Sequence, residues 1–273
     1  MNVDSLRLAL EGLPVPQIRY FDALGSSNDE ALDWISQAGS PDGMLVVADS
    51  QTSGRGRLGR KWVTQPGTSL AFSLALRPTP AEIEHLAYFS PLGAMAICEA
   101  LEALNLAPKI KWPNDVLLNR RKAAGILVEV AWLGSQLQGI VIGIGVNIAP
   151  ESVPPADQLR FPATSVQTAA GQPVDRLALL RSILTSLFAW RARLSEPAFF
   201  AGWEQRLAFR GEWVRLQEAG AQAGASGALE GQLAGIDRGG NLLLKTQTGA
   251  ITAVNVGDVQ LRPIESGDQF AGQ

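Results

Sequence analysis

The stretch VVADSQTSGRGRLGRKW, residues 46–62, constrains how the rest of this chain is organised. It begins with β-branched and apolar residues, which predict a buried strand, and then changes to glycines alternating with cations. Gly54, Gly56 and Gly59 let the backbone approach a ligand closely. Four cations lie in the same segment: Arg55, Arg57, Arg60 and Lys61. Ordering such a loop costs conformational entropy and charge repulsion, which an anionic ligand offsets, so the stretch predicts a binding loop for phosphate or carboxylate.

The same glycines fit two other interpretations. Their spacing matches the G-x-G-x-x-G pattern of dinucleotide-binding loops, but in that pattern the third glycine opens a helix. Here Gly59 leads into Arg60, Lys61 and Trp62, and residues 67–76 then alternate like another strand. No lysine–serine pair typical of a P-loop follows the glycines either. A solvated basic loop without a ligand is the other interpretation.

Length and composition limit the class of protein. A chain of 273 residues is long enough for one large domain with a substantial core and a second, smaller one. A net charge of −3 and a pI near 5.3 argue against a nucleic-acid-binding protein, so the basic cluster is local. The only cysteine, Cys98, lies in an apolar helical run, and the only histidine, His85, has polar neighbours. These two residues cannot assemble a zinc site or a histidine-based triad.

The N-terminal region offers a short leader and a serine pair. Residues 1–14 contain one short helical segment, and residues 18–21 predict a short strand. Ser27 followed by Glu30 predicts a capping box at the start of a helix. Ser26 and Ser27 either serve only as caps or hold a polar ligand at the positive end of that helix. Neither a signal peptide nor an apolar run of membrane length is present, which predicts a cytoplasmic protein.

A second informative stretch covers residues 110–130. Two apolar strand-like runs flank the polar tip at residues 119–121, which predicts a hairpin. Lys111, Asp115 and Lys122 fall at or near strand ends, where they either pair with one another or face a site. A third strand, at residues 139–147, carries Gly143 and Gly145, which permit a ligand to approach the backbone.

These stretches resemble biotin–protein ligases, the biotin–acetyl-CoA-carboxylase ligases. The matching motifs are GRGRLGRKW (54–62), KWPND (111–115), KAAGILVE (122–129) and GIGVN (143–147), and the resemblance covers residues 18–265. It implies an α+β fold with two parts. The first is a mixed or antiparallel sheet with helices packed on one side, which is the class II synthetase-like biotin/lipoate ligase fold. The second is a small SH3-like barrel that follows it. The resemblance also implies that ATP, with Mg²⁺, adenylates biotin. Biotin is then transferred to a lysine of a biotin carboxyl carrier domain of acetyl-CoA carboxylase or a similar carboxylase.

The resemblance implies roles for the matching residues. The catalytic set is Lys111, Arg55, Arg57 and Asp115, with Lys111 contacting the biotin carboxylate and the α-phosphate. The biotin contacts are Ser26, Ser27, Asn28, Gln51, Arg55, Gly56, Arg57, Lys111, Gly125 and Ile126. The ATP contacts are Arg57, Arg60, Trp62, Lys111, Asn114, Lys122 and Asn147. No dedicated protein cluster holds a metal, and Asp115 either helps to hold Mg²⁺ or orients the incoming lysine. Adenylation needs positioning and cations rather than a side-chain nucleophile, which suits this chain.

The predicted domains are a leader (1–14), a catalytic domain (15–210), an SH3-like domain (211–265) and a tail (266–273). Residues 151–172 predict a connecting loop. Asp175 predicts the cap of a following helix, and a second helix is predicted at residues 197–207. Short strands are predicted at 212–216, 228–233, 241–246 and 250–254, with a surface loop at 217–227. The barrel either stabilises the fold or lends cations to the triphosphate. The candidate cations are Arg206, Arg210, Arg215 and Lys245.

Two alternatives to the ligase come from other classes. Lipoate–protein ligases and octanoyltransferases share the catalytic fold, but the GRGR loop and the terminal barrel favour biotin. A biotin-sensing repressor needs on the order of sixty residues of winged helix in front of the catalytic domain. Only about fourteen residues precede the first predicted strand, so we expect no DNA partner. Because no apolar run of membrane length is present, we expect no membrane partner either. Homodimerisation is left open.

Overall fold

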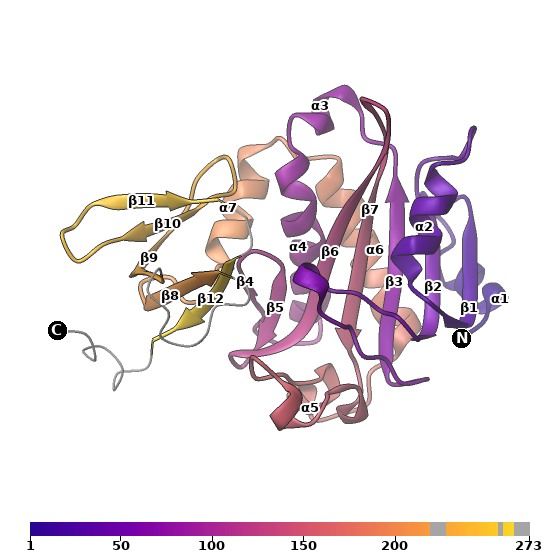
Figure 1. Ribbon diagram of the computed structural model, residues 1–273. Helices are drawn as coiled ribbons and strands as arrows, with labels where there is room; N and C mark the ends of the chain where they lie inside the picture. Colours follow the sequence, from indigo (N-terminus) through magenta and orange to yellow (C-terminus); the bar gives the residue numbers. More distant parts are fainter. Residues whose placement is uncertain (219–227, 256–258, 265–273) are drawn as a thin grey trace.

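A seven-stranded mixed sheet forms the centre of the computed structural model, which describes residues 1–218, 228–255 and 259–264 (Figure 1). Its strand order is β1-β2-β3-β7-β6-β5-β4. The first two strands, β1 (Ile18–Leu24) and β2 (Met44–Gln51), are parallel, and every other neighbouring pair is antiparallel. The remaining strands are β3 (Ser69–Leu76), β4 (Lys109–Lys111), β5 (Asp115–Leu118), β6 (Arg121–Leu133) and β7 (Gln136–Asn147).

Strand β3 explains why helices cover both faces of this sheet. Its large residues, among them Phe72 and Leu74, join the main core beneath α1 (Val3–Ala9), α4 (Phe89–Glu102), α6 (Arg176–Arg191) and α7 (Pro197–Gln205). Its alternate residues are small, and Ala75 packs in a second core with Ile35 of α2 (Ser27–Ile35). Because side chains alternate between the faces of a strand, α2 must lie opposite the other helices. The expectation that helices pack on one side is therefore corrected for α2, while the α+β class is confirmed (Figure 1).

The N-terminal segment is integrated into the main core. Leu6 and Leu10 are buried there, and Arg181 of α6 donates a hydrogen bond of 3.1 Å to the carbonyl of Glu11. Asn2 caps α1 by accepting from the amide of Ser5. Residues 1–14 thus pack as part of the larger unit rather than standing apart from it.

The predicted capping box at the start of α2 is wrong. The N-cap is Ser26, whose side chain makes no capping hydrogen bond. The amide of Ser27 instead donates to Gln51 Oε1 at 2.7 Å, and Glu30 pairs with Arg19 at 2.6 Å. The helix therefore begins against the end of β2, because a residue distant in the sequence replaces the local cap.

Other segments differ from the sequence prediction in detail. The run 110–118 is split between β4 and β5 by a turn that contains the cis Trp112–Pro113 bond. Residues 151–172 include a short helix, α5 (Val166–Ala170), with Ser165 as its N-cap. Asp175 caps α6 as predicted. The remaining short elements are α3 (Pro80–Ile83), η1 (Arg57–Gly59), η2 (Leu86–Tyr88), η3 (Pro150–Ser152) and η4 (Ala156–Gln158).

A second, antiparallel sheet follows α7 and agrees with the expected SH3-like unit. Its strand order is β11-β10-β9-β8-β12. The strands are β8 (Trp213–Glu218), β9 (Leu229–Ile236), β10 (Leu242–Lys245), β11 (Ile251–Val254) and β12 (Val259–Pro263), of which β12 was not predicted. Most of the predicted loop at 217–227 lies outside the described residues.

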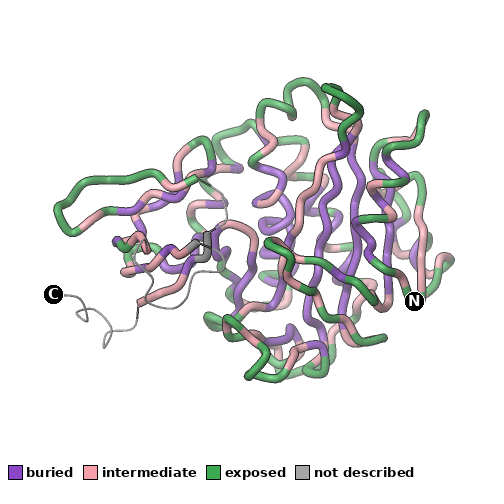
Figure 2. Tube along the Cα trace, in the orientation of Figure 1, coloured by how far each residue is buried: buried purple, intermediate pink, exposed green. Residues whose placement is uncertain are grey.

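The two sheets share one core. Buried stretches of the chain occur in both sheets (Figure 2). Val214 and Leu244 of the second sheet belong to the same cluster of buried side chains as Trp112. The indole of Trp112 also donates to the carbonyl of Gly240 at 3.0 Å, and the hydroxyl of Tyr88 donates to that of Arg238 at 2.7 Å. These contacts hold the second sheet beside the first. Among the described residues, no helix combines the length and apolarity needed to cross a membrane.

Candidate active site

One cleft lies on the α2 face of the larger sheet and encloses about 900 Å³ including its open mouth. Strands β2, β6, β7 and β12, the turn before β5 and the glycine–arginine loop (residues 54–61) all contribute to it. Every predicted site residue except Asn147 lines this cleft. Those that do are Ser26, Ser27, Asn28, Gln51, Arg55, Gly56, Arg57, Arg60, Trp62, Lys111, Asn114, Asp115, Lys122, Gly125 and Ile126.

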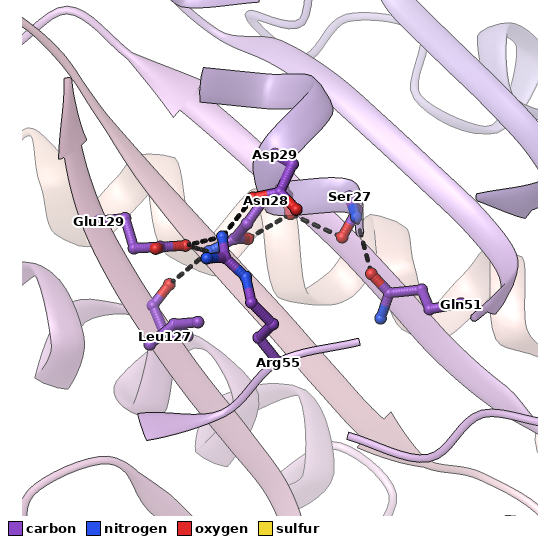
Figure 3. A network of polar contacts seen from close by, with 8 residues as sticks. Ser27, Asn28, Asp29, Gln51, Arg55, Leu127 and Glu129 are labelled. Carbon is purple, nitrogen blue, oxygen red and sulfur yellow. Dashed lines mark hydrogen bonds and ion pairs between the residues drawn. The ribbon is translucent and has the colours of Figure 1, made fainter. Parts of the chain in front are cut away.

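The end of the cleft beside α2 is lined by uncharged polar side chains of α2 and of the residue before it. Ser26, Ser27 and Asn28 are each only 4% exposed. Ser27 is held through its amide by Gln51, and the Asn28 amide nitrogen lies 2.7 Å from Glu129 Oε2 (Figure 3). Such an end fixes the orientation of a neutral ligand group by hydrogen bonds.

The glycine–arginine loop is anchored at its first arginine. Arg55 pairs with Asp29 at 2.5 Å and with Glu129 at 2.9 Å, between α2 and β6 (Figure 3). The loop then turns back on itself, because the amide of Gly56 donates to the Arg60 carbonyl and the amide of Trp62 donates to the Gly54 carbonyl. The predicted binding loop therefore lies over the cleft as a small hairpin.

The opposite end of the cleft holds two lysines on either side of one carboxylate. Asp115 pairs with Lys122 at 2.5 Å and with Lys111 at 3.4 Å. Burial alone raises the pKa of Asp115, but Lys122 and Lys111 outweigh it and hold that pKa at about 2. Burial lowers the pKa of Lys111 from 10.5 to about 8, and Asp115 only partly opposes this shift. This end of the cleft therefore presents more positive than negative charge.

Arg60 and Trp62 carry buried polar groups without a partner. Arg60 Nε and Nη2 and Trp62 Nε1 are buried and make no hydrogen bond within the described residues. Burial also lowers the pKa of Arg60. Buried polar groups are almost always hydrogen-bonded in proteins, so unpaired donors lining a cleft indicate that a ligand supplies the acceptors. An anion with several oxygen atoms satisfies three such donors.

The structure corrects one predicted site residue and adds a packing role to two predicted glycines. Asn147 is buried outside the cleft, and its amide donates to the carbonyl of Thr164 at 3.1 Å, which holds the segment before α5. Gly143 and Gly145 of β7 line the cleft, as predicted, and each also leaves room for a side chain of this chain. A Cβ at Gly143 would overlap the amide of Asn28, and a Cβ at Gly145 would overlap the indole of Trp62.

The second sheet supplies one cation to the cleft, and it is not among the four expected. Arg262 of β12 lines the cleft, together with Leu261. Burial and the nearby Arg60 lower the pKa of Arg262. Three of the expected cations lie elsewhere in ion pairs: Arg206 with Glu102, Arg210 with Glu204, and Arg215 with Glu230. Lys245 is exposed and also lies outside the cleft. No local motif marks Arg262, since only the pairing of β12 with β8 brings it to the site.

Asp115 does not fit the role of a magnesium ligand. Its two carboxylate oxygens already face Lys122 and Lys111, whose positive charges oppose a divalent cation. Within residues 1–218, 228–255 and 259–264, no group of three or more histidine, cysteine, aspartate or glutamate residues is placed to hold a metal. We therefore assign no protein ligand to Mg²⁺.

Comparisons with known proteins agree with this geometry. Residues 20–147 match the model of the biotin/lipoate A/B protein ligase family, and residues 224–262 match that of the biotin protein ligase C-terminal domain. The biotin–[acetyl-CoA-carboxylase] ligase of Paracoccus denitrificans is 36% identical, covering 82% of this chain and 92% of that protein. The bifunctional ligase/repressor BirA of Bacillus spizizenii is 34% identical, covering 96% of this chain and 79% of that protein.

A solved structure extends the similarity to the whole fold. The biotin protein ligase of Aquifex aeolicus, in complex with biotin and ATP, superimposes with a TM-score of 0.76 at 28% identity. The match covers 91% of this chain and all of that one. Since the sequence and the fold both match, this chain belongs to the biotin–protein ligase family.

Proposed function

We propose that this chain attaches biotin to a lysine of a biotin carboxyl carrier domain in two steps. In the first, a biotin carboxylate oxygen attacks the α-phosphorus of ATP and the α–β phosphoanhydride bond breaks, which releases pyrophosphate. In the second, the uncharged lysine amine attacks the acyl carbon of biotinyl-adenylate, and AMP leaves with the shared oxygen. The relatives named as biotin–[acetyl-CoA-carboxylase] ligases support a carboxylase carrier as the acceptor.

The observation that carries this proposal is the set of unpaired buried donors at the cationic end of the cleft. Among the described residues these are three atoms, two of Arg60 and one of Trp62, and Lys111, Lys122 and Arg262 line the same region. Two substrates that both carry negative charge have to meet there, so the cations lower the electrostatic cost of their approach. The polar end at Ser27 and Gln51 is then left for the ring of biotin, with Gly125 and Ile126 forming the wall between the ends.

Each cation has a distinct place in this scheme. Lys111 is almost fully buried beside Asp115, so it acts on the reacting carboxylate and α-phosphate as a fixed charge. Lys122 is more exposed, with 26% of its side chain accessible, and it lies 5.6 Å from the centre of the Trp62 ring. Arg55 holds the loop closed, and Arg57, which also lines the cleft, retains the adenylate.

Mass spectrometry of a carrier domain tests the proposal. The purified chain is incubated with ATP, a carrier domain and either biotin or lipoate, and the intact mass of the carrier is measured. We expect a biotin adduct with biotin and none with lipoate. A carrier whose acceptor lysine is replaced by arginine controls for indiscriminate labelling, and Lys111→Ala should abolish most of the adduct. A lipoate adduct in place of the biotin adduct would overturn the assignment.

A further inference from the structure

We propose that Ser73 and Glu129 are positioning residues that set the direction of hydrogen bonding at the biotin end of the cleft. Neither residue lines the cleft, and both act through residues that do. In this scheme Ser27 accepts a hydrogen bond from the ligand and cannot donate one. The inference rests on the proposed function, because it takes the ureido ring of biotin as the ligand group.

Glu129 determines which atoms donate and which accept in this chain of hydrogen bonds. Its Oε2 lies 2.9 Å from Arg55 Nη2 and 2.7 Å from Asn28 Nδ2, so a carboxylate in an ion pair accepts from the asparagine (Figure 3). The same nitrogen also lies 3.3 Å from the carbonyl of Leu127. Neither acceptor has a proton to give, so the asparagine must turn its nitrogen towards them. Its Oδ1 therefore faces the other way, towards Ser73.

Ser73 carries this direction to Ser27. It is fully buried in β3, and its Oγ lies 2.5 Å from Asn28 Oδ1 and 2.7 Å from Ser27 Oγ. The amide oxygen cannot donate, so the single hydroxyl proton of Ser73 must serve Asn28. The proton between the two hydroxyls is then that of Ser27. Only lone pairs of Ser27 Oγ are left for the cleft.

Gln51 supplies the complementary group. Its Oε1 accepts from the amide of Ser27 at 2.7 Å, which leaves the Nε2 amino group as its donor. The polar end thus presents one fixed acceptor, at Ser27, beside one donor, at Gln51. A cyclic urea has N–H donors next to a carbonyl acceptor, so its ring edge matches this pair. A ring that carries only acceptors would leave the proton-less side of Ser27 unpaired.

Packing explains why the chain of contacts is held so tightly. Ser73 lies opposite Gly143 in the β3–β7 ladder, and Asn28 occupies the space that a side chain at Gly143 would need. The network therefore passes over a glycine that itself lines the cleft.

Calorimetric titration of biotin into the full chain, without ATP, tests the inference. Ser73→Thr keeps the hydroxyl, whereas Ser73→Val has the same shape without it. We expect Ser73→Val to weaken biotin binding about tenfold relative to Ser73→Thr, which is about 1.4 kcal/mol. In a Ser27→Ala background this difference should vanish, because Ser73 acts through Ser27. Equal losses in the two variants, or a difference that persists without the Ser27 hydroxyl, would overturn the role of Ser73.

Glu129→Gln tests the same direction of hydrogen bonding at a partly exposed position, since 27% of the Glu129 side chain is exposed. Glutamine can donate to Asn28 and so permits the amide and both hydroxyls to reverse. We expect a several-fold loss of biotin affinity that Ser27→Ala removes, and unchanged affinity would overturn the role of Glu129. If the unaltered chain binds no biotin, the proposed function itself fails, and that result is distinct from a failure of the variants.

Discussion

At the scale of single residues, the charge at one end of the cleft depends on how one buried carboxylate is shared by two lysines. Asp115 is nearer to Lys122, at 2.5 Å, than to Lys111, at 3.4 Å. The carboxylate therefore stabilises the charge of Lys111 less than that of Lys122. Burial is the larger effect on Lys111 and lowers its pKa to about 8. Its charge is thus available at neutral pH and is lost under mildly alkaline conditions.

The first prediction concerns this loss of charge. Because Lys111 is neutral above its pKa of about 8, kcat/KM for adenylate formation should fall as the pH rises through that value. Bound phosphate stabilises the charged form of Lys111 and raises its pKa in the complex, so kcat should fall only at higher pH than kcat/KM. Lys111→Arg, which stays protonated, should remove the alkaline fall even if its rate is lower. ATP–pyrophosphate exchange measured from pH 7 to about 10 checks this, with exposed Lys109→Arg as the control. An identical alkaline limb in Lys111→Arg would assign it to another group.

At the scale of elements, strand β7 separates the two ends of the site. Its glycines at 143 and 145 face the same side of the sheet, and each provides space for a different side chain. Asn28 occupies the first position and Trp62 the second. A single strand therefore positions both the biotin end and the loop that leads to the cationic end.

A matched pair of substitutions follows from this division. Gly143→Ala should displace Asn28 and raise the Kd for biotin at least tenfold, with a smaller effect on ATP. Gly145→Ala should displace Trp62 and raise the KM for ATP instead. Gly139→Ala serves as the control, since its Cβ would meet Ile35 of α2 and should cost stability alone. The two substrates are titrated separately, and the same loss for both substrates in both variants would contradict the division.

The glycine–arginine loop gives a second prediction at this scale. Arg57 lines the cleft and adds a cation to the loop. In the proposed function this loop retains the adenylate and excludes stray amines. Arg57→Gly should therefore release biotinyl-adenylate into solution and label bystander proteins. Labelling of added serum albumin, followed by streptavidin blotting, measures this leakage. Arg121→Gly, an exposed arginine outside the cleft, is the control. Modification confined to the carrier would argue against a retaining loop.

At the scale of the whole molecule, the second sheet completes the cleft. Its core is continuous with that of the larger sheet, and β12 places Arg262 beside Lys111 and Arg60. Arg262 lies near enough to Lys111 to help burial to lower the pKa of that lysine. The expectation of a docked unit is confirmed, although a different cation reaches the site.

The last prediction tests this contribution. Arg262→Ala should raise the KM for ATP about tenfold or more and leave the Kd for biotin unchanged, because it removes charge only at the cationic end. Arg215→Ala is the matched control, since that arginine lies on the same sheet, pairs with Glu230 and does not line the cleft. If a folded Arg262→Ala variant has unaltered ATP kinetics, the second sheet only stabilises the fold and does not contribute to ATP binding.

The sequence by itself predicted most strands, and its resemblance to biotin–protein ligases implied the class of fold and nearly all of the cleft. Local patterns can be recognised in the sequence without the tertiary structure. Examples are the alternation in β3, the glycine–cation loop and the order of the four motifs. The tertiary structure decided what depends on contacts between distant segments. It placed α2 on the opposite face, gave the cap position to Ser26 and turned Asn147 away from the cleft. It also brought Ser73, Glu129 and Arg262 to the site, because strand pairing alone determines which distant residues become neighbours.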